Sequence, residues 1–260
     1  MRKTSPARRS VRTVRKKAKF YQFHAMYRWK TKKTMLLAFM SFAGTAMAAN
    51  VFYDNAGDAT LNSSVVGSVI VDNYWRTTNP YSTPTHLTIA PDVMISNQLR
   101  TYGRSSVLLT GNSSFGGLLN MDNFSSVTMT GTSRANSDIG IWASSTITLR
   151  ENASVAGLFE VGHSSSIHLY VTSVAVDGQI LTQDAKLSDY GTRSTQANNP
   201  LVGTISGTME HGLAFINNFG IFNTGTYSGS ADIFVHVVPE PASAWLMLLG
   251  AAWMGAKRKR

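Results

Sequence analysis

The chain has 260 residues, of which 43% are hydrophobic and 15% charged, a composition typical of a folded protein. It contains no cysteine, which excludes disulfides, thiolate metal sites and cysteine nucleophiles. The net charge of +10 comes from the two ends, because residues 1–34 hold 13 Lys and Arg and residues 257–260 hold 4. Residues 54–232 contain seven Lys and Arg and thirteen Asp and Glu. A nucleic-acid groove needs clustered cations, so we expect no nucleic-acid partner.

The N-terminal segment is typical of an export signal. A cationic stretch precedes the apolar run 35–44, and the small residues Ala46 and Ala48 follow it. Signal peptidase recognises small residues at these two positions, and the apolar run is too short for a permanent membrane anchor. We therefore expect residues 35–48 to direct export and signal peptidase to cleave after Ala48.

The basic leader, residues 1–34, is longer than the cationic region of an ordinary signal. One interpretation is a true start at Met26, which would leave a signal of ordinary proportions. The other is a basic arm that binds nucleic acid or anionic lipid. We favour the start at Met26.

A repeat of twenty residues begins at Thr85, which we number as column one. Apolar residues recur two columns apart, as expected for one face of a strand. Column three holds Leu87, Val107, Val127, Ile147 and Ile167, and column five holds Ile89, Leu109, Met129, Leu149 and Leu169. Column eleven holds Ile95, Phe115, Ala135, Val155 and Ala175. A further pair occupies columns fifteen and seventeen, as in Leu119/Met121, Ile139/Ile141 and Phe159/Val161.

Each repeat therefore predicts two or three short strands with Ser, Thr, Asn and Gly at the corners. One unit cannot bury its apolar face alone, but stacked units can, at about 4.8 Å per coil. The pattern predicts an all-β parallel β-helix or β-solenoid over residues 49–238, with handedness left open. The alternative is an antiparallel β-sandwich or jelly roll with regular strand spacing.

The register decays after Asp177, and strand-like sequence returns near residues 212–225 and 231–237. Ile233, Val235 and Val237 alternate with polar or aromatic residues, so we expect a last strand that closes the domain. Residues 50–84 do not fit the period, and we expect them to cap the open end of the solenoid.

The C-terminal segment 239–260 has three parts. Pro239, Glu240 and Pro241 form an extended, accessible triplet, since the two prolines prevent a helix from continuing backward. Residues 242–256 carry no charge and as a helix would reach about 22 Å, a marginal span of the inner membrane. The cationic end favours a cytoplasmic location and consists of Lys257, Arg258, Lys259 and Arg260.

This tail resembles the PEP-CTERM sorting signal of Gram-negative bacteria. The resemblance covers residues 238–260 and places the three parts in the required order after an N-terminal signal. It implies that exosortase recognises the triplet, removes the tail and passes the protein to the cell surface or an extracellular polymer matrix. The alternative is a plain tail anchor with incidental prolines.

No catalytic constellation emerges from the repeat. Its acids, Asp92, Asp122, Asp138, Glu151 and Glu160, occupy different columns. Only Asp92 and Glu151 lie in adjacent columns, and three coils would separate them by about 14 Å. His163 and His168 could approach each other across a corner, yet no third ligand has metal-binding spacing. We expect no catalytic site, no cofactor and no metal.

The sequence thus predicts an exported, non-enzymatic surface or matrix protein. We expect it to pass through the export machinery, signal peptidase and exosortase, with a transient stay in the inner membrane. Hydroxyl-rich walls suit association with exopolysaccharide. The competing hypothesis is a polysaccharide-active lyase or hydrolase on the same β-helix.

Overall fold

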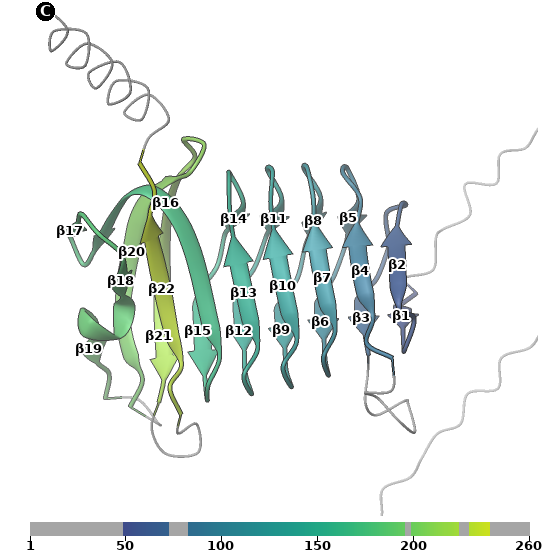
Figure 1. Ribbon diagram of the computed structural model, residues 1–260, viewed down its shortest axis with the longest axis horizontal. Coiled ribbons are helices and arrows are strands. Elements are labelled where there is room, and N and C mark those ends of the chain that lie inside the picture. Colours follow the sequence, from purple (N-terminus) through teal and green to yellow (C-terminus); the bar gives the residue numbers. More distant parts are fainter. Residues whose placement is uncertain (1–48, 73–82, 196–198, 224–228, 240–260) are drawn as a thin grey trace, which may run out of the picture. The chain divides into compact units, whose positions relative to one another are not determined.

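The computed structural model describes residues 49–72, 83–195, 199–223 and 229–239. These residues are all-β, and their strands stack in rows along the molecule (Figure 1). Within the described residues the one helical element is the short 3-10 helix η1, Leu187–Asp189.

Most strands belong to one of three parallel ladders. Ladder A comprises β2 (Asp58–Leu61), β4 (His86–Ile89), β7 (Ser106–Leu109), β10 (Ser126–Met129), β13 (Thr146–Leu149), β16 (Ser166–Val176) and β22 (Asp232–Val237). Ladder B comprises β5 (Met94–Ile95), β8 (Ser114–Phe115), β11 (Arg134–Ala135) and β14 (Ser154–Val155). Ladder C comprises β1 (Val51–Tyr53), β3 (Val69–Val71), β6 (Leu99–Thr101), β9 (Leu119–Met121), β12 (Ile139–Ile141), β15 (Phe159–Gly162) and β21 (Ala214–Phe222).

The twenty-residue period is confirmed by the register of these ladders. Val107 pairs with Val127 and Val127 with Ile147, each twenty residues on, and the same offset relates neighbouring strands of ladders B and C. Columns three, five, fifteen and seventeen point inward and are buried. The mostly parallel arrangement is consistent with a β-helix or β-solenoid and not with an antiparallel sandwich or jelly roll.

In the corners between ladders A and B, one residue at column seven or eight takes a left-handed backbone. In the first coil it is Asp92 at column eight, with φ 65°. Glycine takes column seven in the next two coils, with φ 58° at Gly111 and 67° at Gly131, and it adopts such angles without steric cost. Glu151 takes the same position with φ 58°, where a side chain is strained. The turn chemistry of the sequence therefore sets where each coil bends.

A column of hydroxyl residues is buried at column one. Thr85, Ser105, Ser125, Ser145 and Ser165 are each at most 1% exposed. The Ser105 hydroxyl donates to the Tyr102 carbonyl at 2.7 Å, and the hydroxyls of Ser125 and Ser145 lie 3.3 Å apart. These small hydroxyl side chains fit inside the coil and form hydrogen bonds with the backbone or with one another, as buried polar groups require.

The N-terminal residues 50–72, which the sequence leaves outside the period, join the ladders. β1, β2 and β3 extend ladders A and C, and Val65 bridges to Ile95 in ladder B. Their offset to the next coil is 28 residues in ladder A and 30 in ladders B and C. The longer connection between β3 and β4 hides the period in the sequence.

The fifth repeat departs from the period earlier than predicted. β16 continues to Val176 without the corner that every preceding coil makes, so Ala175 is only half-buried. Tyr170 to Ser173 stand where other coils carry a turn-forming Asp, Gly or Glu-Asn pair, and the β-branched Val171 favours continued strand.

The C-terminal part closes this end of the coils by antiparallel pairing. β20 (Leu201–Met209) pairs with the extension of β16 and with β21, while the short strands β17 (Gln179–Leu181), β18 (Ala185–Lys186) and β19 (Thr192–Arg193) pair along the edges. The predicted last strand is confirmed as β22, in which Ile233 and Val235 are buried.

Candidate functional site

The described residues begin and end next to the two predicted processing positions. Ala49 donates its backbone N–H to the Val66 carbonyl at 2.9 Å, and Val238 donates to the Val171 carbonyl at 2.8 Å. Pro239 is the last residue described. The remaining predicted positions lie outside the described residues and are Ala46, Ala48, Glu240, Pro241, Lys257, Arg258, Lys259 and Arg260.

The outward side of ladder A, which we call face A, is rich in hydroxyl side chains. Columns two and four supply them, including Thr88, Ser106, Ser126, Thr128, Thr146, Thr148 and Ser166. Some form hydrogen bonds from coil to coil, as the hydroxyls of Thr146 and Ser166 do at 3.2 Å, and His86 Nδ1 lies 2.6 Å from Ser106 Oγ. An open hollow of about 460 Å³ lies over β2, β4, β7 and β10.

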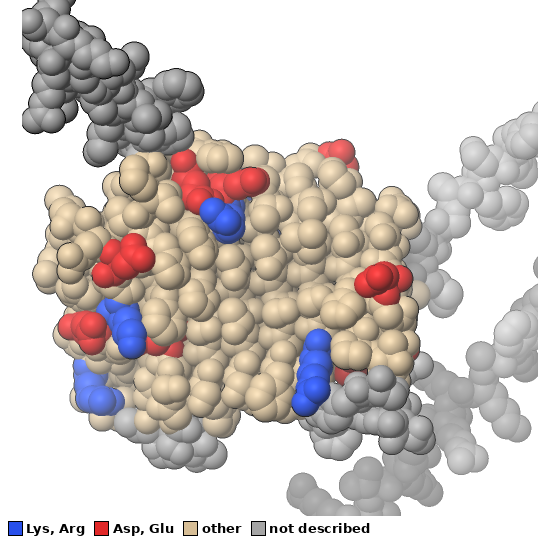
Figure 2. All heavy atoms as spheres, viewed as in Figure 1, with Lys and Arg blue, Asp and Glu red and all other residues tan. Residues whose placement is uncertain are grey.

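Charged side chains are sparse over the middle of the molecular face shown in Figure 2 and gather toward its edges. The uncharged area extends over several successive coils in the same view. Such a surface offers hydrogen bonds without a strong field, so it suits a polar, uncharged ligand better than a polyanion.

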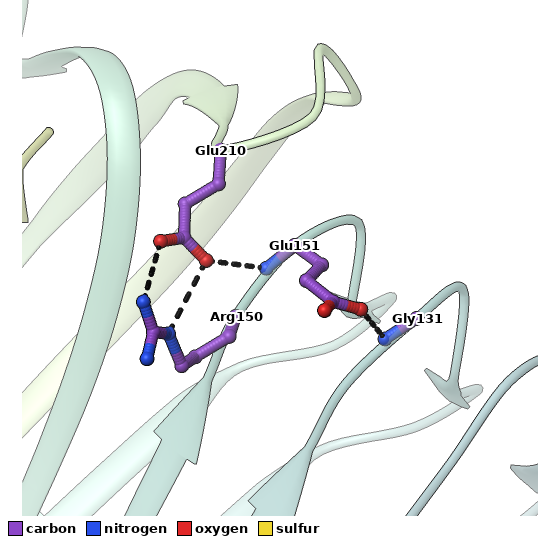
Figure 3. A network of polar contacts seen from close by, with 4 residues as sticks. All are labelled: Gly131, Arg150, Glu151 and Glu210. Carbon is purple, nitrogen blue, oxygen red and sulfur yellow. Dashed lines mark hydrogen bonds and ion pairs between the residues drawn. The ribbon is translucent and has the colours of Figure 1, made fainter. Parts of the chain in front are cut away.

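Figure 3 shows a polar network at one corner of the coils. The Glu210 carboxylate accepts hydrogen bonds from Arg150 Nη2 at 2.9 Å and from the Glu151 backbone N–H at 2.7 Å. The Glu151 carboxylate in turn accepts from the Gly131 N–H. The network joins the β20–β21 turn to two coils, and its acids already have structural partners, which argues against a catalytic role for Glu151.

Glu210→Ala should lower the free energy of unfolding by about 1–2 kcal/mol, because the Glu151 N–H and Arg150 both lose their acceptor. Arg150 is 48% exposed, so water replaces part of its bond. Urea unfolding measures the loss. Glu210→Gln keeps an acceptor for the Glu151 N–H and should lose less; equal losses for Gln and Ala would contradict this account.

A cluster of rings lies on face A where β22 pairs with β16. His168 Nδ1 and His236 Nε2 are 3.0 Å apart, so one ring donates a hydrogen bond to the other, and the two rings lie nearly parallel, with planes that differ by 4°. His236 Nδ1 lies 3.2 Å from a carboxylate oxygen of Asp184. Phe234 stacks on His168 and Tyr170 on His236, at centroid distances of 5.0 and 4.6 Å.

This cluster holds the closing strand in place. Arg150 lies 4.4 Å from the Tyr170 ring centre and Lys186 5.4 Å from that of Phe234, so cations cover the outer ring faces. The pKa of the Asp184 carboxyl is lowered, chiefly by the hydrogen bond from the Val237 N–H. Sequence reasoning missed the cluster because β22 pairs with a strand more than sixty residues earlier.

The stability of the protein should fall as the pH drops below about 6.5, the ordinary pKa of histidine. Partial burial and the neighbouring His236 lower the pKa of His168, so the folded state resists protonation that the unfolded chain accepts. The stability that the neutral His168 contributes is therefore fully present above its pKa in the unfolded chain. It is lost as the pH falls through its lowered pKa in the folded state.

Melting temperatures of the wild type and His168→Thr between pH 7.5 and 5 test this expectation. Thr occupies the same column at Thr88, Thr128 and Thr148, so the substitution suits the strand. The variant should show a smaller decrease in melting temperature over this range. An unchanged pH dependence would show that His168 is not the group responsible.

The structure corrects the expectation that the acids of the repeat stay apart. Glu160 on β15 is half-buried, and its carboxyl has a pKa raised by this burial and by the negative charge of Asp138. Asp138 itself accepts the Leu158 N–H at 2.8 Å. Columns fourteen and sixteen of successive coils are close enough for this effect, which comparison of the same and adjacent columns overlooked.

No group of three or more His, Asp or Glu within the described ranges could hold a metal ion. Of the two histidines considered from sequence, His168 pairs with His236, whereas His163 packs edge-on against Trp142 at 6.2 Å. In the part of the chain that the structure describes, no helix is long and apolar enough to cross a membrane.

Comparisons with known proteins give no further assignment, since no protein-family model, no curated protein and no solved structure matches the chain.

Proposed function

We propose that this chain is an exported, non-enzymatic surface or matrix protein with a β-solenoid body that associates with exopolysaccharide through face A. The observation that carries the proposal is the register of face A, where hydroxyl residues repeat from coil to coil at a fixed offset of twenty. Successive coils present these groups about 4.8 Å apart. A pyranose unit in an extended polymer advances by a similar distance, so several units can bond at once.

Each hydroxyl contact is weak in water, and many together give useful affinity. The hollow over β2, β4, β7 and β10 provides a starting point for such a chain. The sparse charge of this surface favours a neutral polymer. Retardation in native gels that contain dissolved hydroxyethylcellulose or dextran tests the association, with alginate as the acidic comparison.

We further propose that exosortase processes the protein, as the resemblance of residues 238–260 to the PEP-CTERM signal implies. The described strands lie between Ala49 and Val238, which supports removal of both flanking segments without loss of any of these strands. Intact-mass measurement of the protein recovered from its native host should give a species that begins at Ala49 and ends near Pro239. A chain that retains residues through Arg260 in every fraction would reject exosortase processing.

A polysaccharide lyase or hydrolase is the second candidate, because Glu160 has a raised pKa and lies in a pocket. Catalysis would need a second carboxylate free to act, and one Asp138 oxygen already accepts the Leu158 N–H. Release of reducing ends or unsaturated sugars from the same polymers distinguishes the two functions. We expect none, whereas activity abolished by Glu160→Gln would establish the enzyme.

A further inference from the structure

The Glu160 carboxyl lies between two glycines on the outer side of ladder C. In the register of the ladder, Gly140 on β12 and Gly220 on β21 pair directly with Glu160. Neither neighbour has a side chain that could shield or bond the carboxyl. Glu160 also makes no hydrogen bond or ion pair with any other described residue. A half-buried acid without a partner is costly unless a ligand satisfies it.

Glu160 lines an open pocket of about 410 Å³, within the range of about 300–1,000 Å³ that is usual for ligand sites. Its polar lining comes from Ser194, Thr204 and Asn218. The Thr204 hydroxyl donates to Asn218 Oδ1 at 3.0 Å, while the Asn218 amide nitrogen has no acceptor among the described residues. The pocket thus offers both an acceptor at Glu160 and a donor at Asn218.

Aromatic rings lie beside the same pocket. Phe222 belongs to its lining, and its ring comes within 3.2 Å of the position that a Cβ on Gly220 would take. Phe219 also borders the pocket, but it is 1% exposed and belongs to the core. Trp142 packs against Phe222 with ring centres 5.7 Å apart and folds back over Gly162, two residues beyond Glu160. The glycines of β12, β15 and β21 therefore make room for the Trp142 and Phe222 rings on the outer side of ladder C.

We propose that the Glu160 pocket binds one neutral sugar ring, with the carboxylate accepting two adjacent hydroxyls and the aromatic rings contacting the apolar C–H side of the pyranose. Sugars combine these two kinds of surface, and rings favour C–H groups through their negative faces. A cation fits less well, because Asp138 is engaged with the backbone and no third acid among the described residues joins the site. This pocket lies on ladder C, apart from face A, so the proposal does not depend on polymer binding there.

The test uses the full chain in a zwitterionic detergent that carries no sugar. Its tryptophans are labelled with 5-fluorotryptophan, and the Trp142 resonance is identified by its absence in Trp142→Phe. The probes are the methyl glycosides of glucose, galactose, mannose and N-acetylglucosamine. At least one should shift the Trp142 resonance in a saturable way.

Glu160→Ala should weaken this binding about tenfold or more, because it removes charge-assisted hydrogen bonds. Glu160→Gln retains one acceptor and should weaken it less. Asn120→Ala is the matched control, since Asn120 occupies the same outward column of ladder C two coils away. The control should bind as the wild type does.

Three results would overturn the proposal: no saturable shift with any of the four glycosides, equal binding by wild type and Glu160→Ala, or loss of the response on addition of EDTA, which would identify a cation site. Gel retardation by polymers reports on face A independently. A protein that binds polymer but no glycoside would retain the proposed function and lose this pocket.

Discussion

Deletion of residues Ser125–Ser144 should leave a folded protein that is one coil shorter. The deletion removes β10, β11 and β12 and brings β7 next to β13 with matching columns, since the period is twenty residues. The inward residues still meet their counterparts, Leu109 facing Leu149 in place of Met129. We expect retained β-sheet circular dichroism and a free energy of unfolding lower by about 1–3 kcal/mol, the typical share of twenty residues.

The matched control is a deletion of half a repeat, Ser125–Arg134. It joins column twenty to column eleven, so that one coil lacks its strand in ladder A and the apolar columns no longer align. This shorter deletion should abolish cooperative unfolding altogether. If both deletions fold equally well, or both fail, the stacked-coil account of stability is wrong.

Asp72→Ala should lower the free energy of unfolding by about 3–5 kcal/mol, the second large effect. Asp72 is fully buried, and its carboxylate accepts hydrogen bonds from the Thr85 N–H at 2.8 Å, the Thr85 hydroxyl at 2.6 Å and the Asn55 N–H at 2.8 Å. Alanine removes all three acceptor contacts at once. The backbone φ of 51° at Asp72 adds strain in the alanine variant, since Asp tolerates this region better than Ala.

Asp72→Asn separates the loss of the hydrogen-bond acceptors from the backbone strain. It keeps the shape and one acceptor oxygen and tolerates the positive φ, so its loss should be clearly smaller than that of alanine. Chemical denaturation of the three proteins gives the comparison. A loss below about 1 kcal/mol for Asp72→Ala would show that water replaces the carboxylate at this site.

Much of the candidate site could not be predicted, and the reasons are specific. The Glu160 pocket needs β21 beside β15, and the His168–His236 pair needs β22 beside β16. Both contacts join residues about sixty positions apart outside the repeat, where no period signals the pairing. Asp138 raises the pKa of Glu160 because columns fourteen and sixteen of adjacent coils come close, a proximity that column numbers alone do not reveal.

The sequence by itself determined the body of the fold. Apolar residues at columns three and five recur without a gap from Leu87 to Leu169, and stacking is the arrangement that buries them all. Only the tertiary structure decided how the two ends are built. The longer connection after β3 and the missing corner in β16 change which strands pair. They do not change the strand propensity of the residues, so the pairing at both ends depends on long-range contacts and not on local sequence pattern.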